Sequence, residues 1–419
     1  MSERRTLFNM AFTKGASRGM TPWAPIPIVQ VDVDELTNLV IDDVLAGQRV
    51  WLEVMKDGQV VGIVEATAEA AGGLSKSELQ VLTRDFADLT LPPRVVVSDE
   101  LLPRASIVVP TLCRDTPRLV RAIESLLTQN YPDFEVIVVD NRPAFSGLEE
   151  LELTLGPKVR TFREPIRGVS AARNRGIINA QGDFVAFTDD DVVVDSNWLR
   201  ELATTFVGNP EVNGIGGLVL PKELKTQAQL WFEEFFGGFK KTYSMEIFSM
   251  ELLKAVDPMF PYAPGRFGAG CNMAIRRSAL LENGSFVVAL GTGTPTHGGE
   301  DLELLMKQVL NGGSLAFEPR AVVRHLHRES EREFLTQVFG YGTGLTAMFT
   351  SLVLRDPRHL ARIIRRIPGG IRLLTTPRNE RSPSSTATYP RRAYLRHVAG
   401  LLYGPFAYVR SVARLSLRR

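Results

Sequence analysis

The middle of the chain alternates short apolar runs with segments of helical spacing. The segments 116–127 and 170–179 repeat apolar residues at the intervals of an α-helix, and Thr116 is the candidate cap of the first. Four strands are expected: the mostly apolar segments 106–110, 134–140 and 184–187, which suit strands buried on both faces, and the segment 159–162. Such an alternation predicts an α/β fold, with a mostly parallel sheet and helices on both of its faces.

The two flanking regions have different patterns. Upstream, 51–54 and 60–65 read as strands joined by the Asp57-Gly58 turn of a hairpin, and a helix is expected over 77–89 with Ser77 as its cap. Prolines at 92, 93 and 103 indicate a linker, whereas the end of the chain is basic and helix-prone. We therefore expect an N-terminal accessory α+β domain (1–103), a catalytic domain (104–330) and a helical basic region (331–419).

The amino-acid composition limits the classes of protein to which this chain can belong. The 419 residues suffice for two or three domains, and 44% hydrophobic content is that of a folded chain. A net charge of +2 argues against nucleic acid as a partner. Two cysteines fit a reducing, cytoplasmic compartment, and the first 20 residues lack the continuous apolar core of a secretory signal. No apolar run is long enough to predict a bilayer-spanning helix.

Candidate chemistry begins with three consecutive acids, Asp189, Asp190 and Asp191, which directly follow the strand 184–187. Adjacent carboxylates repel one another, and carboxylate oxygens suit hard ions such as Mg²⁺ and Mn²⁺. The alternative is a solvated acidic loop. Asp140 and the pair 110–111 also follow predicted strands, and ligands of parallel sheets bind beyond the carboxyl ends of the strands. This shared location favours a binding site.

Several further motifs occur in a fixed order along 105–327. They are 106–111 (SIVVPT), 135–141 (EVIVVDN), 168–176 (GVSAARNRG), 187–191 (FTDDD), 268–274 (GAGCNMA), Glu300-Asp301 and His325-Leu326-His327. In this order they resemble the family 2 inverting nucleotide-sugar glycosyltransferases, which have the GT-A fold. The resemblance covers a little over half of the chain.

The resemblance implies roles for individual residues. It implies that Asp301 is the general base and that Glu300 orients the acceptor. It implies that Asp189, Asp191 and a histidine hold Mn²⁺ or Mg²⁺, with His325 preferred over His327. The residues implied at the nucleotide-sugar donor are Pro110, Thr111, Arg114, Asp140, Arg173, Asp190 and Asn272.

Structural alternatives accompany these roles. Arg173 would otherwise form a surface salt bridge, Asp140 would cap a helix, and Glu300-Asp301 would be an acidic first turn favoured by the helix dipole. The segment 265–272 also reads as a Gly-rich turn before a strand, and the histidines as ordinary surface residues. The loop 291–299 is expected to be a mobile lid over the donor.

The tail mixes arginines with apolar and aromatic residues over 354–372 and 389–419. This composition suits a helix on an anionic membrane surface, and the alternative is a solvated face packed on the catalytic domain. The glycine-rich stretch 340–344 indicates a hinge or close helix packing, since no strand precedes it and no lysine follows.

The expected function is therefore metal-dependent, inverting transfer of a hexosyl group from a nucleoside-diphosphate donor to an acceptor hydroxyl of a glycan, glycolipid or small molecule. A role in polysaccharide or cell-envelope synthesis, on the inner face of the membrane, is expected. One alternative is a sugar nucleotidyltransferase, which the absence of glycines after the first strand at 110–114 disfavours. Another is a non-catalytic nucleotide-sugar-binding module, against which the acids at 300–301 argue.

Overall fold

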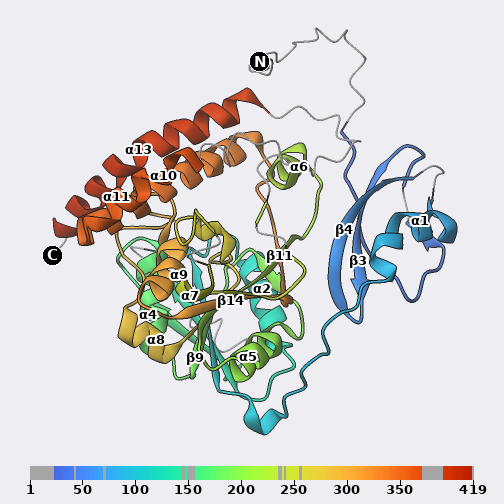
Figure 1. Ribbon diagram of the computed structural model, residues 1–419, viewed down its shortest axis with the longest axis horizontal. Helices are drawn as coiled ribbons and strands as arrows, with labels where there is room; N and C mark the ends of the chain where they lie inside the picture. Colours follow the sequence, from blue (N-terminus) through green and yellow to red (C-terminus); the bar gives the residue numbers. More distant parts are fainter. Residues whose placement is uncertain are drawn as a thin grey trace, which may run out of the picture.

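The computed structural model shows a small N-terminal sheet, a central α/β part and a layer of C-terminal helices (Figure 1). It describes residues 23–41, 44–68, 72–142, 148, 156–234, 238–239, 242–253, 257–369 and 390–417. The Pro- and Ser-rich stretch within 375–390 lies almost entirely outside these ranges.

The N-terminal part is built on the expected hairpin. Strands β3 (Arg49–Lys56) and β4 (Gln59–Thr67) are antiparallel, and β1 (Ile28–Asp32) adds in parallel to β3. The turn has positive φ at both central residues, +49° at Asp57 and +70° at Gly58, as a tight hairpin requires. Short strands β2 (Leu39–Val40) and β5 (Gly73–Leu74) pair beside it.

Helix α1 (Lys76–Ala87) covers this sheet, and its cap corrects the expectation. The cap is Ser75 rather than Ser77. The Ser75 side chain accepts from the Glu78 N–H, and the Glu78 carboxylate accepts from the Ser75 N–H, which is a reciprocal capping box.

The central sheet is a single mixed sheet of nine strands. Its order is β10-β14-β11-β13-β9-β6-β7-β8, with β12 paired to β14. The strands are β6 (Ala105–Thr111), β7 (Phe134–Asp140), β8 (Val159–Arg163), β9 (Phe184–Phe187), β10 (Val192–Val194), β11 (Val212–Pro221), β12 (Glu246–Phe248), β13 (Met273–Arg276) and β14 (Ser314–His325). β9, β6, β7 and β8 are mutually parallel, as are β11 and β14, while β13 runs antiparallel between the two sets.

Helices cover both faces of this sheet. They are α2 (Thr116–Leu127), α4 (Val169–Asn179), α5 (Trp198–Gly208), α6 (Gln227–Glu234), α7 (Met250–Leu253), α8 (Arg277–Asn283) and α9 (Glu300–Leu310), with short 3₁₀ turns η1 (Asp99–Leu101) and η2 (Pro264–Arg266). The side chains of β6 alternate between two cores. Ile107 and Val109 pack with α2 and α5, and Val108 packs with α4 and α9. The expected fold, an α/β sheet covered on both faces, is confirmed, although Asp115 rather than Thr116 caps α2.

The C-terminal layer consists of α10 (Glu331–Arg355), α11 (Arg358–Ile364) and α13 (Arg391–Ser416), which Figure 1 shows stacked above the sheet. Helices α10 and α13 approach closely because glycines face one another. A Cβ placed on Gly342 would lie 2.4 Å from the His397 carbonyl oxygen, and one on Gly404 would lie 1.9 Å from Thr346 Oγ1. Of the two interpretations of 340–344, the structure therefore supports close helix packing.

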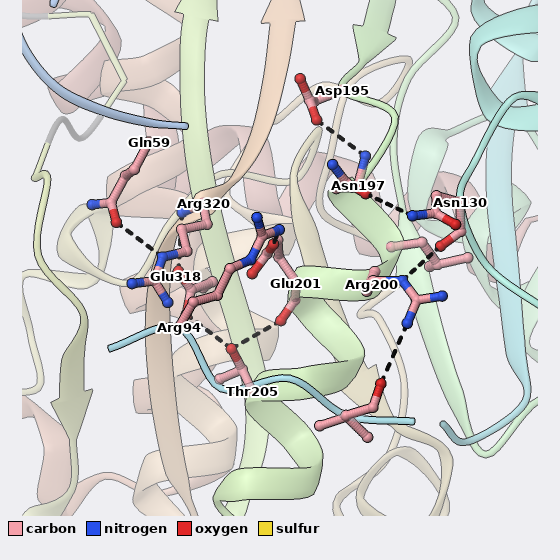
Figure 2. A network of polar contacts seen from close by, with 12 residues as sticks. Gln59, Arg94, Asn130, Asp195, Asn197, Arg200, Glu201, Thr205, Glu318 and Arg320 are labelled. Atoms are coloured by element: carbon pink, nitrogen blue, oxygen red, sulfur yellow. Dashed lines mark hydrogen bonds and ion pairs between the residues drawn. The ribbon is translucent and has the colours of Figure 1, made fainter. Parts of the chain in front are cut away.

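Polar contacts join the N-terminal part to the central sheet. Figure 2 shows Gln59 of β4 accepting from Arg320 Nε of β14 at 2.9 Å, beside Arg94, whose guanidinium pairs with Glu201 of α5. Four residues further along β14, both terminal nitrogens of Arg324 donate to the Glu53 carboxylate, at 2.7 and 2.6 Å. Strand β14, which ends at His325, is thus held by the N-terminal part.

Candidate active site

The carboxyl ends of β6, β7 and β9 lie side by side, as the parallel pairing requires. Thr111 and Asp140 are register partners at the ends of β6 and β7. The Thr111 hydroxyl donates to Asp190 Oδ2 at 2.6 Å, and it accepts from the backbone N–H of Cys113. Pro110, Thr111, Asp140 and Asp190 are therefore brought together at one edge of the sheet, as predicted for the donor site.

Asp140 is buried, and its carboxylate is already engaged by Arg142. The backbone N–H and Nε of Arg142 donate to Oδ1 at 2.9 and 3.0 Å, and Nη2 donates to Oδ2 at 2.7 Å. Arg142 was not predicted as a site residue. It neutralises Asp140 at the position where a nucleotide would have to share that carboxylate.

Arg173 of α4 occupies the centre of the site. Its side chain is only 2% exposed. One terminal nitrogen donates to Glu300 Oε1 at 3.0 Å, and the other donates to Asp189 Oδ1 at 2.8 Å and to the Gly270 carbonyl at 3.2 Å. The guanidinium thus links the acids of two motifs, and its contact with the donor stays a prediction.

Glu300 and Asp301 form the first turn of α9, preceded by the loop 291–299. Burial, reinforced by repulsion from Asp301 and opposed by Arg173, raises the pKa of Glu300 to about 7. Asp301 Oδ2 accepts from the Gly270 N–H at 2.8 Å, and Oδ1 accepts from the Leu302 N–H at 2.8 Å. Both oxygens of Asp301 are thereby oriented, as a positioned base requires.

Asp191 and His325 meet on the other side of the acidic motif. Strand β10 pairs with β14 so that Val192 lies opposite His325, and Nε2 of His325 approaches Asp191 Oδ1 at 3.5 Å. That oxygen is buried and has no hydrogen-bond partner. A carboxylate oxygen and an imidazole nitrogen facing each other without a shared bond fit a hard divalent cation.

The protein supplies few ligands for such an ion. In the described part of the chain, no group of three or more His, Cys, Asp or Glu side chains is arranged to hold a metal. Asp189, the third predicted ligand, turns Oδ1 toward Arg173 instead. The geometry fits a cation bound by Asp191 and His325, with the remaining positions left to substrate oxygens, which is the usual arrangement for Mg²⁺ at phosphates.

A buried chain of hydrogen bonds runs outward from His325. Its Nδ1 lies 3.1 Å from Nδ1 of His327, and Nε2 of His327 lies 2.6 Å from Glu233 Oε1 of α6. A Glu233 carboxylate only accepts, so Nε2 of His327 donates to it, and we infer that Nδ1 of His327 accepts from His325. His325 then donates from Nδ1, and its Nε2 presents a lone pair to Asp191. Burial lowers the pKa of His325 to about 4, which keeps this imidazole neutral at pH 7.

Asn272 and Arg114, both predicted at the donor, lie apart from the contact between Thr111 and Asp190. Asn272 is fully buried, donates to the Leu218 and Ala321 carbonyls at 2.9 and 2.8 Å, and accepts from the Trp198 indole at 2.8 Å. With these contacts it fastens the sheet, and its assignment to sugar hydroxyls is corrected. Arg114 is exposed and lines a cavity beside the loop 291–299, apart from the Thr111–Asp190 contact.

Glu233 and Arg142 were missed because no motif marks them. The signal for Glu233 was an acid directly after the apolar run 230–232, followed by a second acid. An acid at such a position must find a partner when it is buried. That partner lies 94 residues away in sequence.

Comparisons with known proteins agree with this geometry. Residues 106–283 match the model of Glycosyl transferase family 2. A glucosyl-dolichyl phosphate glucuronosyltransferase of Haloferax volcanii is 33% identical over 27% of this chain and 37% of its own length. The succinoglycan biosynthesis protein ExoM of Rhizobium meliloti is 30% identical over 49% of this chain and 62% of its own. The chain thus spans less than two thirds of these relatives.

Among solved structures, a mannosyltransferase from Pyrobaculum calidifontis, in complex with GDP-Man and Mn²⁺, aligns over 81% of both chains with a TM-score of 0.43 and 18% identity. The family model spans the strands and loops that supply Thr111, Asp140, Arg173 and the acidic motif. It therefore confirms the resemblance expected from the motifs. Over residues 106–283, this chain is similar to the glycosyltransferases of family 2.

Proposed function

We propose that this protein transfers a hexosyl group from a nucleoside-diphosphate sugar to an acceptor hydroxyl, with inversion at the anomeric carbon and dependence on Mn²⁺ or Mg²⁺. The observation that carries the proposal is the arrangement around Arg173. Its guanidinium joins Asp189 of the acidic motif to Glu300, the neighbour of Asp301. The candidate cation-binding acids and the candidate base are thereby held at one site.

In this reaction the acceptor oxygen attacks the anomeric carbon, the bond to the donor phosphate breaks, and the acceptor proton passes to Asp301. The divalent cation, when bound at Asp191 and His325, supplies positive charge that stabilises the leaving diphosphate. Glu300 stays paired with Arg173 and orients the acceptor side of the site. Thr111 fixes Asp190 toward the donor.

The experiment is incubation with nucleotide sugars and Mn²⁺ or Mg²⁺, with analysis of the released product. Release of a nucleoside diphosphate supports glycosyl transfer. Release of pyrophosphate would instead identify a sugar nucleotidyltransferase, and binding without turnover would identify a non-catalytic module. Asp301→Asn is expected to lower turnover by about a hundredfold to ten-thousandfold while donor affinity is retained. Near-normal turnover of this variant would refute the assignment of the base.

We further propose that α13 attaches the protein to an anionic membrane surface on the cytoplasmic side, where a glycolipid or cell-envelope glycan is extended. In the part of the chain that the structure describes, no helix has the length and apolar content to cross a membrane. One face of α13 packs on α10, and the opposite face exposes Leu395, Leu402, Phe406 and Val409, spaced by 7, 4 and 3 residues. Arginines flank this stripe, and their charge complements anionic lipid.

Flotation with vesicles of phosphatidylcholine and phosphatidylglycerol tests the attachment. The double variant Leu402→Ser/Phe406→Ser is expected to lose vesicle binding, because it removes the two most exposed apolar side chains of the stripe, at 73% and 74%. Val81→Ser, at a position that is 67% exposed on α1, is the control and keeps binding. Equal flotation of all three proteins would refute the proposal.

A further inference from the structure

A cavity of about 460 Å³ lies between the loop 291–299 and α13. Four arginines line it: Arg114 after β6, Arg167 before α4, and Arg410 and Arg414 on α13. Apolar groups, among them Leu112 and Leu415, form part of the remaining wall. The cavity is therefore amphipathic, with a strongly positive lining.

The positive charge of this lining is not balanced by the protein. The cavity wall contains no Asp or Glu. Within the described ranges, none of the four arginines forms an ion pair, and Arg410 donates only a 3.4 Å hydrogen bond to Tyr403. Arginines elsewhere, such as Arg173 and Arg324, are matched by carboxylates. Four exposed arginines thus line one cavity without counter-charges, and planar guanidinium donors bind phosphate in bidentate fashion.

Of the predicted donor contacts, the cavity wall includes Arg114 and lacks the others. Thr111, Asp140, Asp190 and Asp191 are all absent from its lining. Its wall includes Thr292 to Pro295 and His297, and this loop leads directly into Glu300 and Asp301. An occupant would thus contact the loop that leads into the candidate base.

The exposed apolar stripe of α13 continues from the same cavity. Val409 directly precedes Arg410 and Phe406 lies four residues before it, and both apolar side chains are exposed. An amphiphile can therefore place a charged head among the arginines while its hydrocarbon lies along the helix. An anion without an apolar part would contact the arginines of the cavity but would leave the apolar stripe of α13 uncovered.

We propose that the cavity binds the phosphate of a lipid-linked acceptor. The proposal rests on the glycosyl transfer proposed above and specifies the class of acceptor. The diphosphate of the nucleotide donor could also bind arginines, and the experiment below distinguishes this donor phosphate from the phosphate of a lipid-linked acceptor.

The experiment compares two double variants of the same helix by isothermal titration calorimetry. Arg410→Glu/Arg414→Glu reverses two charges inside the cavity, and Arg392→Glu/Arg396→Glu reverses two exposed charges outside it. The probes are farnesyl phosphate, farnesol, and UDP, GDP or dTDP with Mn²⁺. We expect the wild type to bind farnesyl phosphate at least tenfold more tightly than farnesol. The cavity variant should lose at least tenfold in farnesyl phosphate affinity, while the control variant and the nucleotide affinities stay within twofold.

Three results would overturn the proposal. The first is a wild type that does not prefer farnesyl phosphate to farnesol. The second is an equal loss in both double variants, which would indicate general charge rather than the cavity. The third is a cavity variant that loses nucleotide affinity alone, which would assign the arginines to the donor. Release of nucleoside diphosphate from nucleotide sugars is measured separately, so the proposed transfer can stand when the acceptor assignment fails.

Discussion

Glu233 is expected to control the affinity of the site for Mn²⁺ although it does not touch the ion. Its carboxylate accepts from His327, and this fixes the chain that leaves Nε2 of His325 free to bind. In Glu233→Leu, Nε2 of His327 loses its acceptor. The proton of His327 then moves to its Nδ1, which faces Nδ1 of His325. Two N–H groups cannot face each other at this distance, so the proton of His325 moves from Nδ1 to Nε2 and blocks the nitrogen that would bind the ion.

The magnitude follows from the burial of this chain. Both Glu233 and His327 have side chains that are 1% exposed, so water cannot replace the lost bond. A hydrogen bond to a charged group contributes about 1.5–3 kcal/mol to stability. Loss of a group that orients a metal-binding histidine typically costs 10- to 100-fold in metal affinity. We therefore expect Glu233→Leu to weaken Mn²⁺ binding by about 10- to 100-fold, and Glu233→Gln by less, since its amide oxygen can still accept.

The assay is electron paramagnetic resonance of free Mn²⁺ in the presence of a nucleoside diphosphate. Nitrogen-15 NMR of the metal-free protein reports the tautomer of His325 independently, and a thermal melt verifies folding. Glu234→Gln is the matched control, because it neutralises the adjacent acid, which pairs with Arg49 instead. Unchanged Mn²⁺ affinity in a folded Glu233→Leu protein would refute the reasoning, as would an unchanged tautomer.

Three further expectations concern stability, each measured by chemical denaturation. Glu53→Ala removes the ion-pair partner of Arg324, and the side chains of Glu53 and Arg324 are 0% and 28% exposed. We expect this variant to lose about 3 kcal/mol of unfolding free energy, the lower end for buried pairs. Asp85→Ala, in the exposed pair with Arg84, should cost under about 1 kcal/mol, and equal losses in the two variants would contradict this. Gly404→Ala should cost about 1–3 kcal/mol because its Cβ would meet Thr346, whereas Gly208→Ala, with no atom within 4 Å, should be neutral or stabilising. Between pH 4.5 and 7 the folded protein holds a proton on Glu300 that the unfolded chain releases, so this residue lowers the free energy of unfolding as pH rises through that window. Glu300→Gln should make the free energy of unfolding depend less steeply on pH. An unaltered pH dependence would contradict the raised pKa of Glu300.

Much of the fold was predictable because its signals are local. A strand buried on both faces is a continuous apolar run, and β6, β7 and β9 appear where these runs occur. The helix caps were less predictable, since Ser75 and Ser77 differ only in which hydroxyl reaches a free N–H.

In the candidate site too, the features set by local sequence were predictable and those set by tertiary packing were not. Strand ends identified Thr111 and Asp140 as neighbours, because parallel register follows from the sheet itself. The partners of Arg173 could not be predicted, since they depend on where α9 and β9 pack after folding. The same holds for Asn272, whose amide forms hydrogen bonds with two carbonyls and an indole from distant segments. The domain boundaries, the roles of the site residues and the cellular location remain predictions.

The glycines of α10 give this helix a backbone contact on each side. A Cβ on Gly299 would lie 2.3 Å from the Gly344 carbonyl oxygen, so the base of the 291–299 loop rests on α10, and Gly342 meets α13 on another face. No long side chain stands between these main chains to absorb a displacement. A displacement of α13 therefore has one helix to cross before it reaches α9. If α13 binds a membrane as proposed, we expect that contact to influence the position of the proposed base.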